Sequence, residues 1–271
     1  MEGTTALRDD SPVDPAHAAA MSDELAVALY EHMVLARSLD ERLVALQREG
    51  AIASHSSAVG EEAAIVGAVA AMHDDDWIFP GSRELAAALW RGMPLSACAH
   101  HVYGTARDAG RGRSSPDPAW WKAARVASVS PLVGTHIPHA VGLAWAARMK
   151  KAPAAALVFF GEGATSTGDF HTGLNFAGVT RAPLVALCRN NGRATSTPAS
   201  RQTASRSFAV KAVAYGLKGV RVDGADVAAV LAAVREARAR AVAGLGGTLV
   251  EAVIPGQDRA DPVARMRAHL H

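Results

Sequence analysis

The centre of the sequence alternates short apolar runs with helical segments, and this alternation limits the possible folds more than any other feature. Apolar runs of strand length cover residues 154–160, 184–188, 220–222 and 248–253. Helical patterns over 165–179 and 226–243 separate them. Strands that alternate with helices form a parallel sheet with both faces covered. The sequence therefore predicts an α/β fold.

The first half of the chain is mainly helical and predicts an extension before this sheet. Helices are expected over 22–50, 60–72, 83–91, 95–103 and 137–149, with a strand-like step at 77–80. Ser22 is a candidate cap for the first helix. We expect residues 1–20 to form a flexible tail. Residues 104–122 are expected to form a long irregular loop. Because no linker divides the rest, we expect residues 21–271 to form a single domain.

Composition excludes several classes of protein. The chain is 49% hydrophobic and 20% charged, which rules out disorder for most of its length. A formal charge of +2 gives no electrostatic reason to expect nucleic acid. No apolar stretch of about 18 residues occurs, and residues 1–20 lack the pattern of a secretory signal, so no membrane partner is expected. Cys98 and Cys188 are interpreted as buried thiols of a cytoplasmic protein.

Oxygen-bearing side chains follow two neighbouring strands of the predicted sheet. Glu162 comes directly after the run 154–160, and Asn191 follows the run 184–188. In an open parallel sheet ligands bind outside the carboxyl ends of the strands, and one β-α-β unit can bring these two residues together. Carboxylate and amide oxygens suit a hard cation such as magnesium, which keeps phosphate oxygens among its remaining ligands.

The surrounding residues add features that favour a phosphate. Gly161 and Gly163 remove Cβ atoms that would obstruct a ligand. A helix that begins near Thr165 would direct backbone N–H groups to the same place, and Arg189 could add a charged contact. Alternatively, Gly-Glu-Gly and Asn-Asn-Gly are ordinary turn signals, and neither alone requires a ligand.

Several separate blocks together resemble a known family. They are 79–84, 130–138, 161–171, 174–177, 188–192 and 220–224, including Gly-Glu-Gly followed near thirty residues later by Asn-Asn. These blocks are similar to the alpha subunit of the thiamine-diphosphate-dependent first component of 2-oxo acid dehydrogenase complexes, of the pyruvate or branched-chain 2-oxo acid type. The resemblance covers roughly residues 25–253, and Glu162 with Arg-Asn-Asn leans toward the branched-chain type.

The resemblance implies a thiamine-diphosphate-binding fold and an enzyme that decarboxylates a 2-oxo acid oxidatively and transfers the acyl group to a lipoyl carrier. Its cofactors would be thiamine diphosphate and magnesium. Its partners would be a beta subunit in an α2β2 heterotetramer and a lipoyl-bearing acyltransferase. The cofactor would lie between alpha and beta chains, so this chain alone would be inactive.

The family pattern also assigns roles to individual residues. Magnesium ligands would be Glu162, Asn191 and the main-chain carbonyl of Arg193. Cofactor contacts would come from Ser82, Arg83, Ser130, Leu132, Gly161, Glu162, Gly163, Ala164, Arg189 and Asn191. His55, in a substrate-side loop, and His136, close to the cofactor by similarity, are the candidates for catalytic residues.

Departures from the family pattern leave three possibilities open. Ser82 stands where the family usually has Tyr, and His136 stands where it has Gln. The loop after residue 253 lacks the family's cofactor-contacting His, and the usual long C-terminal helical region is not expected. The chain is therefore an active subunit, a non-catalytic homologue, or an acetoin-dehydrogenase-like relative.

Overall fold

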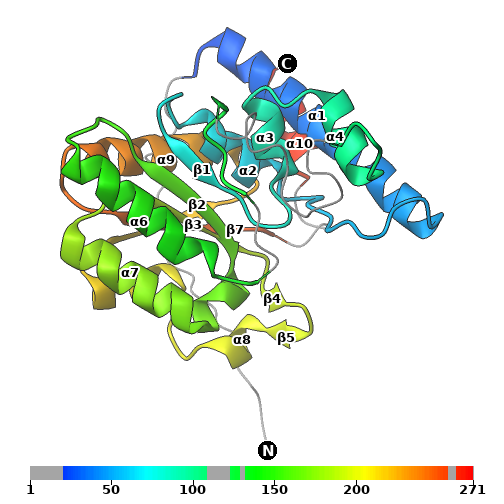
Figure 1. The fold of residues 1–271 in the computed structure, drawn as a ribbon. Coiled ribbons are helices and arrows are strands. Elements are labelled where there is room, and N and C mark those ends of the chain that lie inside the picture. Colours follow the sequence, from blue (N-terminus) through cyan, green and yellow to red (C-terminus); the bar gives the residue numbers. More distant parts are fainter. Residues whose placement is uncertain (1–20, 109–122, 129–131, 256–260, 271) are drawn as a thin grey trace, which may run out of the picture.

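A computed structural model describes residues 21–108, 123–128, 132–255 and 261–270 (Figure 1). Its helices are α1 (Asp23–Arg48), α2 (Glu62–Ala70), α3 (Leu85–Trp90), α4 (Leu95–Val102), α6 (His136–Met149), α7 (Gly168–Thr180), α8 (Ala199–Gln202), α9 (Val227–Val242) and α10 (Pro262–His269), with 3-10 turns η2 (Glu162–Ser166) and η3 (Ala209–Tyr215). The expected tail, 1–20, lies outside the described residues, as does most of the expected irregular loop.

Five parallel strands form the central sheet and confirm the predicted α/β fold. They are β1 (Trp77–Phe79), β2 (Ala156–Gly161), β3 (Leu184–Asn190), β6 (Lys218–Asp223) and β7 (Thr248–Val253). Their order in the sheet is β1-β2-β3-β7-β6. A short antiparallel ribbon, β4 (Arg193–Ala194) with β5 (Thr197–Pro198), follows β3 and was not expected from the sequence.

Side chains of the strands alternate between two cores because successive residues of a strand point to opposite faces. In β2, Leu157 and Phe159 belong to the core shared with α1, α2, α3 and α9. Val158 and Phe160 belong to the core shared with α6, α7 and η3. Figure 1 shows α6 and α7 side by side over one face of the sheet. Both faces are thus buried, which explains the continuous apolar runs in the sequence.

The region after β2 differs from its prediction. A helix was expected from Thr165, but α7 begins at Gly168 and residues Glu162–Ser166 form the 3-10 turn η2. The reason is local capping, because the Thr167 hydroxyl accepts a hydrogen bond from Phe170 N–H at 3.3 Å. The strand end and the helix are therefore separated by an extra turn that carries Glu162.

A C-terminal helix is the second difference. No helix was expected after residue 253, yet α10 spans Pro262–His269 and packs against α1 and α2. Asp261 caps it by accepting the Val263 and Ala264 N–H groups, and Pro262 stands at its first position. Arg37 joins these elements, since it contacts Glu62 at 2.5 Å and Asp261 at 3.1 Å. Among the helices described, none is long and apolar enough to cross a lipid bilayer.

A buried ion pair fixes the turn that leads into β1. Asp76 is fully buried and pairs with Arg238 of α9. Its carboxylate also accepts the Ala155 N–H and the His73 N–H, each at 2.7 Å. Donors from three separate segments therefore converge on one carboxylate.

We predict that Asp76→Ala lowers the free energy of unfolding by about 3–5 kcal/mol, because it leaves the buried Arg238 charge without its partner. Asp75→Ala is the matched control. Asp75 pairs with Arg125 at 2.9 Å but is exposed, so its loss should cost less than about 1 kcal/mol. Urea unfolding followed by circular dichroism measures both, and equal effects would contradict the assignment.

Candidate cofactor site

The site predicted from the two strand tips lies at the carboxyl edge of the sheet. Strands β2 and β3 are parallel neighbours, and Gly161 is paired in register with Arg189. Glu162 follows β2 directly, and Asn191 follows β3 directly. Both residues therefore leave the same edge of the sheet from adjacent strands, as the sequence predicts.

Glu162 is a buried acid that lacks a full set of partners. It is 2% exposed, and its Oε1 atom has no hydrogen-bond partner in the described part of the chain. Burial raises the pKa of Glu162, and the nearby Glu61 carboxylate adds to this, while Gln202 and Arg189 act in the opposite direction. A buried carboxylate of this kind is costly unless a cation or a donor meets it.

A second buried cluster surrounds Arg189. The Arg189 guanidinium forms ion pairs with both Glu61 and Glu84. Burial alone would lower the pKa of Arg189, but these two carboxylates raise it overall, so the guanidinium stays charged. Glu61 also accepts hydrogen bonds from Arg83 Nη1 and Asn191 Nδ2, each at 3.3 Å. Glu61 therefore connects three of the predicted cofactor-binding residues.

The β4–β5 ribbon brings the third predicted metal ligand to the same place. Asn191 Oδ1 accepts the Arg193 N–H at 3.1 Å, which shapes the turn after β3. A Cβ atom on Gly163 would lie 2.7 Å from the Cβ of Ala194, so only glycine fits against the ribbon there. The turns that carry Glu162 and Arg193 are thus in direct contact.

The donor set fits a hard cation. The described residues contain no group of three His, Cys, Asp or Glu side chains arranged to hold a metal. The predicted ligands are instead one carboxylate, one amide oxygen and one main-chain carbonyl, which is an all-oxygen set suited to magnesium. Gly161 leaves open space, because a Cβ there would meet only the Arg189 carbonyl, at 4.0 Å. Burial, the unpartnered Glu162 oxygen and this space agree with a charged ligand.

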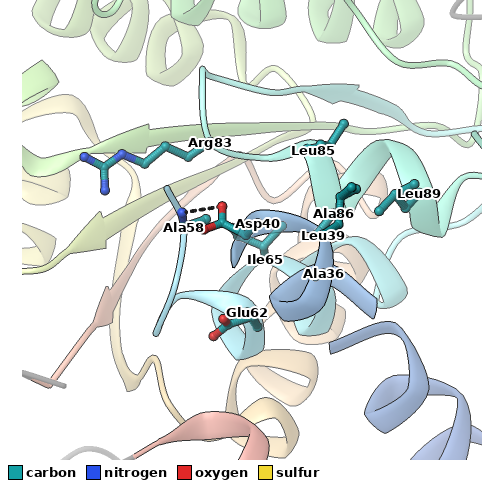
Figure 2. A pocket seen from close by; sticks show the side chains of 10 residues that line it. All are labelled: Ala36, Leu39, Asp40, Ala58, Glu62, Ile65, Arg83, Leu85, Ala86 and Leu89. Atoms are coloured by element: carbon teal, nitrogen blue, oxygen red, sulfur yellow. Dashed lines mark hydrogen bonds between the residues drawn. The ribbon is translucent and has the colours of Figure 1, made fainter. Parts of the chain in front are cut away.

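The remaining predicted cofactor residues are more scattered. Arg83 and Ser82 lie on the segment between β1 and α3, where the Arg83 side chain is 41% exposed. In Figure 2 the Arg83 guanidinium points away from the other labelled side chains around the small cavity between α1, α2 and α3. Ala164 is buried and Leu132 is exposed. Ser130 lies outside the described residues, so its predicted contact stays a prediction.

The two histidines predicted as catalytic are in different environments. His136 is 5% exposed and bonds through Nε2 to the Phe159 carbonyl at 2.6 Å, which ties α6 to β2. Its Nδ1 atom has no partner among the described residues. His55 is half-buried and bonds through Nε2 to Asp40 at 2.8 Å. The structure does not bring the two imidazoles together through any described contact, and both roles stay predictions.

Sequence reasoning missed three acidic residues of this region, namely Asp40, Glu61 and Glu84. Glu61 directly precedes α2, where an acid interacts favourably with the helix dipole. Its burial depends on Arg189, which is 128 positions away in the sequence. The available signal was the position of Glu84 directly after the predicted Arg83.

A parallel α/β sheet with an acid and an amide at neighbouring strand tips is typical of proteins that bind a ligand at the carboxyl edge of the sheet. The family comparison makes this specific: a match to the Dehydrogenase E1 component family covers residues 30–254, and the chain belongs to that family.

Curated relatives agree with this assignment. The chain is 45% identical over 225 residues to "3-methyl-2-oxobutanoate dehydrogenase subunit alpha" of Mycobacterium tuberculosis, covering 83% of this chain and 59% of that protein. It is 40% identical over 233 residues to "2-oxoisovalerate dehydrogenase subunit alpha 2, mitochondrial" of Arabidopsis thaliana, covering 86% and 49%. It is 38% identical over 246 residues to "2-oxoisovalerate dehydrogenase subunit alpha, mitochondrial" of Homo sapiens, covering 91% of this chain and 55% of that protein. The chain thus spans about half the length of these relatives.

We predict that Glu162→Gln stabilises the protein when divalent ions are chelated. Because the pKa of folded Glu162 lies above its usual value of 4.5, ionisation opposes folding at pH 8, and the penalty disappears as the pH falls through the raised pKa toward 4.5. Glu162→Gln should therefore gain about 1–3 kcal/mol at pH 8, and less near pH 5. Denaturant unfolding at both pH values measures this, and a destabilised variant at pH 8 would refute it.

Proposed function

We propose that this chain is the alpha subunit of a thiamine-diphosphate-dependent 2-oxo acid dehydrogenase of the branched-chain type. The observation that carries the proposal is the buried Glu162 carboxylate, whose Oε1 is unpartnered among the described residues, at the strand tip next to Asn191. The names of the relatives, which are 2-oxoisovalerate and 3-methyl-2-oxobutanoate dehydrogenase alpha subunits, support the reaction class.

In this proposal Glu162, the Asn191 amide oxygen and the Arg193 carbonyl hold magnesium. Arg83 and Arg189 contact the diphosphate, to which a guanidinium can donate two parallel hydrogen bonds. Thiamine diphosphate, when bound, supplies the electron sink for decarboxylation of the 2-oxo acid. The protein's part is to bind and orient it, and to exclude water from the buried edge of the sheet.

Charge balance makes the arginine contacts depend on the metal. Arg189 is held by Glu61 and Glu84, so a diphosphate must compete with carboxylates for its donors. A magnesium ion at Glu162 would offset part of the repulsion between that diphosphate and the acids. Metal and diphosphate binding are therefore expected to depend strongly on each other.

The partners in this proposal are a beta subunit in an α2β2 assembly and a lipoyl-bearing acyltransferase. Support comes from the relatives, which are named as subunits. The cytoplasmic location expected from the sequence stays a prediction; Cys98 and Cys188 are buried and unpaired, as such a location favours.

We predict that the α–β assembly, made by co-expression with a beta chain, binds thiamine diphosphate only with magnesium. Glu162→Ala should weaken binding by more than about 100-fold, because it removes the charged ligand. Glu41→Ala, which removes an exposed carboxylate of α1, is the control and should bind like the wild type. Isothermal titration calorimetry measures the affinities. If the wild-type assembly shows neither heat nor thermal protection, the proposed function fails.

A further inference from the structure

A fully buried carboxylate lies in the interior of the sheet, on the strand next to β3. Glu251 of β7 is paired in register with Cys188 of β3 on one side and with Arg221 of β6 on the other. Its side chain is 0% exposed and lies on the same face of the sheet as Leu249, which belongs to the core shared with α6, α7 and η3. A carboxylate in an apolar core is costly unless its oxygens are satisfied, so the contacts of Glu251 indicate its role.

One oxygen of Glu251 holds the turn that follows β3. Glu251 Oε1 accepts a hydrogen bond from Asn190 Nδ2 at 2.7 Å. The Asn190 Oδ1 atom in turn accepts the Gly192 N–H at 2.9 Å. Both ends of the Asn190 amide are therefore fixed. The turn that these bonds shape contains Asn191 and Arg193, which are two of the three proposed magnesium ligands.

The other oxygen of Glu251 holds η3. Glu251 Oε2 accepts the N–H of Ala209, the first residue of η3, at 2.9 Å. Lys211, two residues further along η3, donates from Nζ to Thr165 Oγ1 at 3.2 Å. Thr165 is fully buried and belongs to η2, the turn that begins with Glu162. Glu251 is therefore linked to the turn of the third proposed ligand as well.

Two aromatic rings keep Lys211 in place for this contact. The Lys211 Nζ atom lies 5.9 Å from the centre of the Phe170 ring and 5.5 Å from the centre of the Phe208 ring. An ammonium group at such a distance is attracted to the face of an aromatic ring. The lysine is thus held by both rings and by the Thr165 hydroxyl, and it ties η3 to η2.

We propose that Glu251 is a positioning residue for the magnesium ligands. Through Asn190 it sets the turn after β3, and through η3 and Lys211 it sets η2; these two turns carry all three proposed ligands. Glu251 acts through other residues, because each of its oxygens accepts an N–H group of the protein. The inference rests on the proposed function and assigns the support of its metal site to residues outside the predicted site.

Calorimetric titrations of the α–β assembly with thiamine diphosphate, at a series of fixed magnesium concentrations, test this inference. We expect Glu251→Gln to raise the magnesium concentration for half-maximal binding about tenfold or more, because its NH2 group would face one of the two N–H donors. Asn190→Ala should act in the same direction, and adding it to Glu251→Gln should have little further effect. Glu236→Gln, which changes a half-exposed carboxylate of α9, is the matched control and should behave like the wild type.

Two results of these titrations would overturn the proposal. One is a wild-type magnesium dependence in both Glu251→Gln and Asn190→Ala, and the other is full additivity of the two substitutions. If the wild-type assembly binds no thiamine diphosphate at any magnesium concentration, the proposed function fails instead. The failure of the inference and that of the proposed function are therefore distinguishable.

Hydrogen–deuterium exchange of the assembly, with divalent ions chelated, keeps the test independent of cofactor binding. Lys211→Met should speed exchange mainly in residues 162–166, and Asn190→Ala mainly in residues 190–194. Glu251→Gln should speed exchange in both turns, and Lys211→Arg should keep the wild-type rate. A uniform increase across the sheet would mean a general loss of stability and would overturn the positioning role. If Glu251→Gln does not assemble, Lys211→Met and Asn190→Ala still test the two links separately.

Discussion

The burial of the Arg189 charge at the end of β3 is the constraint on which the site depends. A guanidinium that is taken out of water needs carboxylates at its donors, and Glu61 and Glu84 provide them. These two residues belong to the segments just before α2 and α3, so the N-terminal helices are fixed against the carboxyl edge of the sheet. The same contacts place Arg83 beside Asn191 through Glu61.

The sequence predicted most of the fold because its signals were local. The apolar run before Glu162 and the run 248–253 are buried on both faces, and such runs identify strands in a parallel sheet. Thr167 shows where this reasoning stopped, since a threonine inside an apparent helical pattern caps α7 and leaves Glu162 on a separate turn. α10 was missed although Asp261 followed by Pro262 is a recognisable helix start.

The site was predictable to the extent that neighbouring strand tips determine it. Glu162 and Asn191 were found because a parallel sheet places consecutive strand ends side by side. Asp40, Glu61 and Glu84 were missed because their roles arise from contacts between residues distant in sequence, and a single sequence does not distinguish a buried acid from a solvated one. The partner of His55 was hidden for the same reason, since Asp40 lies 15 positions earlier on a helix.

The buried thiol of Cys98 has a practical consequence. It lines a pocket beside His55, is 2% exposed, and is almost entirely protonated at neutral pH because its pKa is near 11. Thiolates, not thiols, attack electrophiles, so maleimides and iodoacetamide will label Cys98 only when α4 moves away from its neighbours. The rate of that labelling reports how often this part of the protein opens locally, and a molecule that fills the pocket would slow the labelling.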